Sequence, residues 1–327
     1  MKTYSLTALF LFFVCNLAFS QATINRGPYL QKATTSSITI QWRTDVATES
    51  VVWYGSSPTN LSQNVQNAIP AEDHLVTING LNNASTYYYA VGDENGPLAG
   101  GNESFYFKTN PAIGSNTPFL AWVQGDAGVG TQTQRDTRDG FLTHLGGSPN
   151  DIDLMLMLGD NAYSDGKDSE YQDALFNDMY EDIMNKAVLY PTLGNHDSYS
   201  TDYEDRTGPF YDIFTFPVNG ESGGSPSGTE AYYSYDYANT HFLVLNSEDA
   251  DRSPNGEMAQ WIFDDLSNTQ QDWIIAYFHH PIYSGAHNNE SDDANHEKDM
   301  RDNILPILEL FYSDLGLYGH THNYQRS

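Results

Sequence analysis

The chain has 327 residues, and its 43 Asp and Glu against 14 Lys and Arg give it a formal net charge of −29. The length is sufficient for two domains and one sizeable core. The excess of acidic side chains argues against partners such as nucleic acid or anionic lipid, and is best interpreted as a solubility device.

Residues 1–20 have the pattern of a secretory signal peptide. Lys2 supplies a positive start, residues 6–19 form an apolar run, and Ala18 and Ser20 place small residues before a cut at Gln21. An uncleaved anchor helix is the alternative, but the run is short for a membrane span. We therefore expect a secreted, periplasmic or cell-surface protein with no membrane attachment after cleavage.

Cys15, the only cysteine, lies within this segment. The mature protein then has no disulfide and no thiolate, so any dimer is non-covalent. Any bound metal must be held by imidazole, carboxylate, amide or phenolate groups.

Residues 23–111 read as short strands separated by turns. Alternating or apolar runs, each four to seven residues or so, occur at Ser37–Trp42, Ser50–Tyr54, His74–Ile78, Thr86–Val91 and Ser104–Lys108. Several short strands of this kind predict a small β-sandwich. His74 stands alone among them and is interpreted as a strand residue.

After Pro111, apolar strands alternate with helical segments, which predicts an α/β domain with layered sheets. The expected strands are Phe119–Val123, Ile152–Leu158, Val188–Leu193, His241–Leu245, Trp273–Phe278 and Leu315–Tyr318, with Tyr232–Tyr237 forming a hairpin with the strand after it. The expected helices are Gln134–Leu145, Ser169–Asn185, Gly256–Leu266 and Asn295–Phe311.

Polar residues suited to chemistry follow five of these strands directly. They stand in Gly125-Asp126-Ala127-Gly128, Gly159-Asp160-Asn161-Ala162-Tyr163, Gly194-Asn195-His196-Asp197, His279-His280-Pro281 and Gly319-His320-Thr321-His322. Each fragment alone is weak, because Gly-Asp after a strand is commonly a turn. Their recurrence at five strand ends, where sites of α/β folds collect, indicates one functional site.

Two Asp, one Asn, one Tyr and three or four His suit a pair of borderline or hard metal ions. Two metals about 3.5–4 Å apart can clamp the attacking and leaving oxygens of a phosphoryl displacement. A trivalent and a divalent cation together outweigh the charges of Asp126, Asp160 and an ionised Tyr163, so such a site stays attractive to anions within an acidic protein.

These motifs resemble the signature of the purple acid phosphatases, a branch of the calcineurin-like metallophosphoesterases: GDxG, GDxxY, GNH[DE], VxxH and GHxH. Only the fourth departs from it, with Ala276 where Val is usual. The N-terminal segment is similar to the fibronectin-III-like domain of that family, in Arg26–Gln31, Trp42–Thr44, Tyr54-Gly55 and Ser85–Tyr89.

The resemblance implies a fibronectin-III-like β-sandwich over residues 21–112 and an α/β metallophosphoesterase domain of four layers (α/β/β/α) over residues 113–327. It also implies that one metal is held by Asp126, Asp160, Tyr163 and His322, and the second by Asp160, Asn195, His279 and His320. Because phenolate favours ferric iron, the expected cofactor is a binuclear centre of Fe(III) with a divalent ion (Fe, Zn or Mn).

By the same resemblance, His196 binds the phosphate or helps to protonate the leaving group, and His287 has a similar role. His280 either contacts substrate or is structural. The expected activity is hydrolysis of small phosphate monoesters by a metal-bound hydroxide, with an acid optimum plausible for a ferric site. A phosphodiesterase with the same metals is the nearest alternative, and a binding module on an inactive phosphatase fold is the other.

The chain stops at Ser327, directly after the GHxH segment, whereas members of this family usually continue with further strands. We therefore expect the sequence to be a fragment of a longer chain, in preference to a domain that closes early with unpaired sheet edges.

Overall fold

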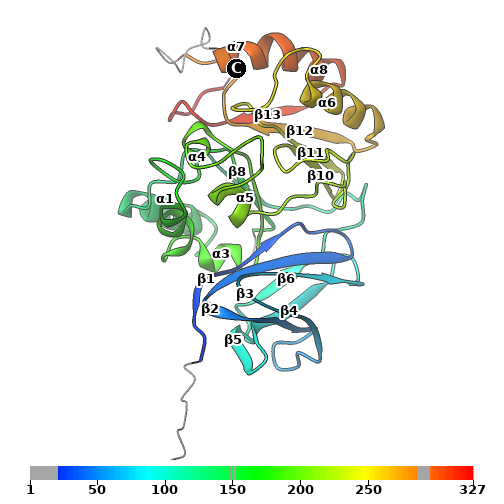
Figure 1. Ribbon diagram of the computed structural model, residues 1–327. Coiled ribbons are helices and arrows are strands. Elements are labelled where there is room, and N and C mark those ends of the chain that lie inside the picture. The colour runs from blue at the N-terminus through cyan, green and yellow to red at the C-terminus, as the bar shows by residue number, and fades with distance from the viewer. Residues whose placement is uncertain (1–20, 148, 150–151, 286–294, 327) are drawn as a thin grey trace, which may run out of the picture.

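The computed structural model describes residues 21–147, 149, 152–285 and 295–326, and the predicted signal peptide lies outside them. An all-β N-terminal domain precedes an α/β domain (Figure 1), as the sequence predicted. Within the described residues, none of the helices combines the length and apolarity needed to span a membrane.

The N-terminal domain consists of six strands. They are β1 (Ile24–Gln31), β2 (Ser37–Gly55), β3 (Gln63–Asn79), β4 (Thr86–Asp93), β5 (Gly96–Gly100) and β6 (Tyr106–Lys108). The sequence did not predict β1 or β5, because Gly27-Pro28 interrupts the alternation of the first and glycines bound the second.

The two strands predicted at Ser37–Trp42 and Ser50–Tyr54 are a single strand, β2. Its first half pairs with β1 and its second half with β4, and its register against β3 shifts between Arg43 and Ser50. Such shifts bend a strand, so β2 exchanges one neighbour for another along its length. The exposed residues 45–47 at the bend break the alternation, which is why the sequence read as two strands.

Two sheets form the centre of the α/β domain. In the first, β7 (Ala121–Gln124), β8 (Leu154–Met157) and β9 (Val188–Pro191) are parallel neighbours. In the second, the order is β10 (Tyr233–Tyr237), β11 (Thr240–Val244), β12 (Trp273–Phe278) and β13 (Leu315–Tyr318). The hairpin of β10 and β11 was predicted, and β11 to β13 are parallel.

Helices flank the sheets. The bounds are α1 (Gln132–His144), α2 (Asp168–Tyr171), α3 (Glu181–Met184), α4 (Asn195–Ser198), α5 (Pro209–Ile213), α6 (Glu257–Asn268), α7 (Asn295–Asp299) and α8 (Leu305–Leu310), with π-helical turns η2 (Gln172–Phe176) and η4 (Met300–Ile304). In Figure 1, α6, α7 and α8 lie along the β10–β13 sheet, on the side away from β8.

The helix predicted over Ser169–Asn185 is interrupted. It leaves helical geometry at Asn177, and Asp178 takes a positive φ of 54° before α3 begins. By contrast, the segment predicted over Asn295–Phe311 is helical throughout, as α7, η4 and α8.

Tyrosines join the two sheets. The rings of Tyr190 in β9 and Tyr235 in β10 stack with centroids 3.8 Å apart. Tyr233 Oη donates to the Pro191 carbonyl at 2.8 Å, and Tyr277 Oη donates to the Tyr190 carbonyl at 3.1 Å. These bonds satisfy hydroxyls that burial would otherwise leave unpaired, and they hold β9 against the second sheet.

The N-terminal domain packs directly on the α/β domain. β1 pairs in parallel with β9 through Leu30 and Val188, and both domains contribute to one apolar core. Arg26, itself 2% exposed, donates to Asp168 at 2.9 Å and to Gln172 at 2.9 Å. A buried guanidinium needs such partners, so this contact fixes the two domains against each other.

The imidazole of His241 in β11 lies buried between two carboxylates. Its Nδ1 is 2.8 Å from Asp236 in β10, and its Nε2 is 2.8 Å from Asp265 in α6. Burial alone would lower the pKa of His241, but the hydrogen bonds to Asp236 and Asp265 and their charges raise it to about 9. The imidazolium therefore ties the β10–β11 hairpin to α6.

This arrangement predicts a stability that depends on pH. Because the folded pKa of about 9 lies above the unfolded pKa of about 6.5, the contribution of His241 to the unfolding free energy is complete below pH 6.5 and is lost as the pH rises through 9. We expect the wild type to lose on the order of 3 kcal/mol over that range relative to His241→Gln, measured by urea unfolding. Equal pH dependence in both proteins would contradict the assignment.

Candidate metal centre

The chemical side chains predicted from sequence meet at the carboxyl ends of the strands. Asp126 follows β7, Asp160 and Tyr163 follow β8, and Asn195 follows β9 at the start of α4. His279 follows β12, and His320 and His322 follow β13. The tyrosine-joined sheets thus bring five loops to one place.

The backbone at these loops is unusual. Four of the ten non-glycine residues with positive φ among those described are predicted ligands: Asp126, Asp160, His320 and His322. Such conformations are costly for side chains other than glycine and concentrate at functional sites. The position before Asp160 requires glycine, because a Cβ on Gly159 would lie 2.6 Å from Nδ1 of His279.

The first group consists of Asp126, Asp160, Tyr163 and His322. Tyr163 Oη lies 2.9 Å from Asp160 Oδ2, 3.4 Å from Asp126 Oδ1 and 3.1 Å from His322 Nε2. His322 Nε2 is 3.5 Å from Asp126 Oδ1. All four functional groups therefore converge on one point.

The second group consists of Asp160, Asn195, His279 and His320. Asn195 Oδ1 lies 3.0 Å from His279 Nε2 and 3.0 Å from His320 Nδ1, and the two ring nitrogens are 3.2 Å apart. His279 Nε2 is also 3.4 Å from Asp160 Oδ1. Asp160 thus faces both groups, Oδ2 toward the first and Oδ1 toward the second.

The second group fits a cation. His279 Nδ1 donates to the Leu158 carbonyl at 2.9 Å, so Nε2 is the ring nitrogen that is left to bind a proton or a metal ion. Nε2 points toward the Asn195 oxygen, which is an acceptor, and toward Nδ1 of His320. Acceptors this close to one another repel unless a proton or a metal ion lies between them.

Asp160 and His279 strongly shift each other's pKa. Burial raises the pKa of Asp160, but the hydrogen bond and charge of His279 lower it to about 2. Burial lowers the pKa of His279, and its interaction with Asp160 raises it to about 9. Burial and then the carboxylates of Asp126 and Asp160 raise the pKa of Tyr163, so a phenolate at this position needs a metal cation beside it.

A buried network supports the loops and includes residues that the sequence did not single out. Asp197 accepts hydrogen bonds from the backbone of Asn161 and Gly194 and from the hydroxyl of Tyr171. These bonds join the β8 and β9 loops and fix Asp160 relative to Asn195. Asp197 stood in the GNHD motif, but no local pattern revealed its partners.

The other predicted residues lie around this centre. His196 is partly exposed, its backbone N–H donates to Asp160 Oδ1 at 2.9 Å, and its Nδ1 donates to the Ser164 carbonyl at 2.6 Å. His280 is buried at 2% exposure, with its ring nitrogen 3.0 Å from Ser247 Oγ. His287 lies outside the described residues.

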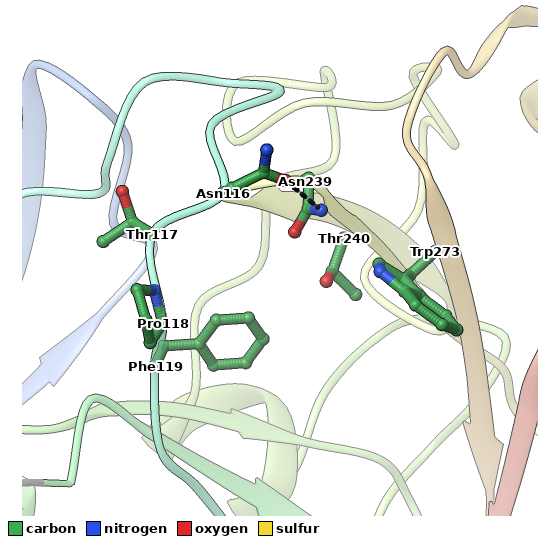
Figure 2. Close-up of a pocket in the computed structure, with 7 residues that line it drawn as sticks. All are labelled: Asn116, Thr117, Pro118, Phe119, Asn239, Thr240 and Trp273. Atoms are coloured by element: carbon green, nitrogen blue, oxygen red, sulfur yellow. Dashed lines mark hydrogen bonds between the residues drawn. The ribbon is translucent and has the colours of Figure 1, made fainter.

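A cavity of about 420 Å³ opens at the first group, and Asp126 and His322 are part of its lining. A second cavity of about 310 Å³ lies elsewhere, where Phe119 precedes β7 and Thr240 and Trp273 begin β11 and β12 (Figure 2). Its lining, which includes the hydrogen-bonded pair Asn116 and Asn239, contains no titratable side chain. Of these two cavities, the first adjoins the predicted metal ligands.

Comparison with known proteins places both parts of the chain. Residues 122–324 match the family model of the calcineurin-like phosphoesterases, and residues 28–109 match that of the purple acid phosphatase N-terminal domain. Purple acid phosphatase 15 of Arabidopsis thaliana is 29% identical over 283 residues, covering 78% of this chain and 49% of the relative. The purple acid phosphatase of Glycine max is 26% identical, covering 78% and 52%.

A solved structure of purple acid phosphatase PPD1 from yellow lupin seeds superposes with a TM-score of 0.71 at 20% identity. It covers 91% of this chain and 59% of the lupin chain. This likeness supports the fold. The chain spans about half the length of the first two curated relatives.

The coupling of Asp160 and His279 can be measured in the metal-free protein. We expect the His279 ring to lose a proton near pH 9 in an imidazole-nitrogen NMR titration, and in Asp160→Asn we expect this pKa to fall below the usual value, because burial then dominates. His241 also titrates near pH 9 and is an internal control that the substitution leaves unchanged. An unshifted His279 in Asp160→Asn would contradict the coupling.

Proposed function

Because the chain belongs to the calcineurin-like phosphoesterase family and, within it, to the purple acid phosphatases, we propose that it hydrolyses small phosphate monoesters at a binuclear metal centre. The observation that carries this proposal is the meeting of seven donor side chains in two groups that share Asp160. No ligand position of the family pattern is replaced, so the inactive binding module is disfavoured.

We assign the first cation to Asp126, Asp160, Tyr163 and His322, and the second to Asp160, Asn195, His279 and His320. Phenolate, carboxylate and imidazole suit Fe(III) at the first position, and amide and imidazole suit a divalent Fe, Zn or Mn ion at the second. When bound, the two cations supply Lewis acidity and neutralise charge on the phosphate.

His196 is the chain's own candidate for proton transfer. The Ser164 carbonyl can only accept, so Nδ1 of His196 keeps its proton. Further protonation then occurs at Nε2, and the resulting imidazolium can donate to a phosphate oxygen or to the leaving alcohol. The assignments of His287 and of His280 as substrate contacts remain predictions.

The remaining proposals concern the setting of the enzyme. The signal pattern of residues 1–20 supports export, and the anionic surface supports small soluble esters as substrates in place of nucleic acid. We keep 21–112 and 113–327 as the two domains, although β1 pairs with β9 across that boundary. With Cys15 removed, any dimer is non-covalent.

The donor set does not separate monoesters from diesters, and a phosphodiesterase is therefore the competing function. Turnover of p-nitrophenyl phosphate compared with bis(p-nitrophenyl) phosphate distinguishes the two. Faster cleavage of the monoester supports the proposal, and faster cleavage of the diester overturns it in favour of the competitor.

Removal of the shared carboxylate should abolish activity. We expect Asp160→Asn to lower kcat/KM for p-nitrophenyl phosphate at least about 1000-fold, because both cations lose a ligand. Metal content measured on the same samples should fall as well. Asp264→Asn, on the exposed face of α6, is the matched control. Retention of activity in Asp160→Asn would refute the binuclear mechanism.

The phenolate assignment has a spectroscopic test. With iron bound, we expect a visible charge-transfer band in the wild type and its loss in Tyr163→Phe, since no other tyrosine hydroxyl lies within the two ligand groups as described. Tyr312→Phe is the control and should keep the band, because Tyr312 is 86% exposed and belongs to neither ligand group. A band that persists in Tyr163→Phe would remove Tyr163 from the ligand set.

A further inference from the structure

A third group of metal-ligating side chains lies beside the two already described. Glu248 follows β11, His280 follows β12, and His296 lies in α7. None of the three belongs to the seven donors of the binuclear centre. Their donor atoms all lie within 4.8 Å of one another.

The spacing of these donors suits one small cation. Glu248 Oε2 is 3.4 Å from His280 Nε2 and 3.7 Å from His296 Nε2. Zinc bonds to imidazole nitrogen and carboxylate oxygen are about 2.0–2.2 Å long, so two ligands of a tetrahedral zinc lie about 3.4 Å apart. The rings of His280 and His296 are stacked, with centroids 4.5 Å apart, which brings their Nε2 atoms to the same carboxylate.

The chemical state of Glu248 also points to a ligand. Its Oε2 is buried and has no hydrogen-bond partner within the part of the chain that the structure describes. A buried carboxylate oxygen without a donor is costly, whereas a bound cation would satisfy it.

The ring of His280 is held in place from behind. Its Nδ1 is 3.0 Å from Ser247 Oγ, and that hydroxyl accepts the backbone N–H of His280 at 3.0 Å. Histidine ligands of metals commonly have such a partner on the second ring nitrogen. Arg252 Nη1 donates to the Ser247, Glu248 and Ala250 carbonyls and so fixes the loop that carries Glu248.

We propose that Glu248, His280 and His296 form a third cation site, of the Zn²⁺ class, next to the binuclear centre. Two imidazoles and one carboxylate are a zinc donor set that leaves one position open. The side chain of His296 is 35% exposed, which provides a path from solvent. The positive charge of Arg252 opposes binding of a cation, and the negative charge of Asp299, 3.7 Å from Arg252, offsets that effect in part.

This site contacts the binuclear centre directly. The ring of His280 lies 4.4 Å from that of His320 and 5.0 Å from that of His279, centroid to centroid. A cation on His280 therefore fixes a ring that packs against two ligands of the second metal. The inference rests on these contacts and is independent of the proposed reaction.

The test is a count of zinc. Protein stripped of metal and dialysed against buffered Zn²⁺ should bind one equivalent fewer in Glu248→Gln and in His296→Gln than in the wild type, with at least a tenfold loss of affinity for that equivalent. His144→Gln, at the exposed end of α1, and Glu309→Gln, on α8, are matched controls that should bind as the wild type does. Circular dichroism of the stripped proteins checks that the variants fold.

Zinc-edge anomalous diffraction from wild-type crystals provides a second readout that needs no variant. A peak between the three side chains supports the proposal. Equal zinc counts and affinities in the wild type and both variants, or the absence of that peak at saturating Zn²⁺, would overturn it. Because the count is a difference between variants, failure of the binuclear centre to bind zinc does not alter the result.

Discussion

The site depends on the carboxylate of Asp160 being shared. Its Oδ2 lies 2.9 Å from Tyr163 Oη and its Oδ1 lies 3.4 Å from His279 Nε2, so one side chain links a phenol-containing group with an imidazole-containing group. The backbone of Asp160 has a positive φ of 52°, and Asp197 on the β9 loop binds the neighbouring Asn161. The contact between Asn161 and Asp197 therefore helps to hold Asp160 in this unfavourable backbone conformation.

The contacts between Asp160 and the histidines require the two sheets to lie at a fixed separation. Asp126, Asp160 and Asn195 follow strands of the first sheet, whereas the three histidines of the ligand groups follow strands of the second. The tyrosines between the sheets set this separation, because Tyr277 and Tyr233 donate to carbonyls of β9 itself. The same strand pairs with β1, so packing of the N-terminal domain bears on the position of Asn195.

Much of this arrangement could be predicted from the sequence, because the predicted ligands follow strands whose apolar runs are clear. The strands Trp273–Phe278 and Leu315–Tyr318 have the predicted bounds, and the five loops after strands meet as expected. The break of the predicted helix at Asn177 and the continuity of β2 depend on tertiary contacts, which periodicity does not encode. Glu248 and His296 were not singled out because they stand in no motif, and the supporting role of Asp197 was missed because its bonds to Asn161 and Tyr171 cross between loops.

The sharing of Asp160 also bears on how an acidic chain holds a site for anions. Without cations, the interaction with His279 lowers the pKa of Asp160 to about 2, and the same interaction raises the pKa of His279 to about 9. A proton on His279 thus balances Asp160 before any metal binds. Bound cations would replace that single charge with a larger one while the carboxylates stay the same, so the field of the loops would turn positive although the net charge of the chain is −29. The acidic surface and an anion site would then be compatible, because the positive charge would come from metal ions that replace a proton at a buried position, where solvent screens little.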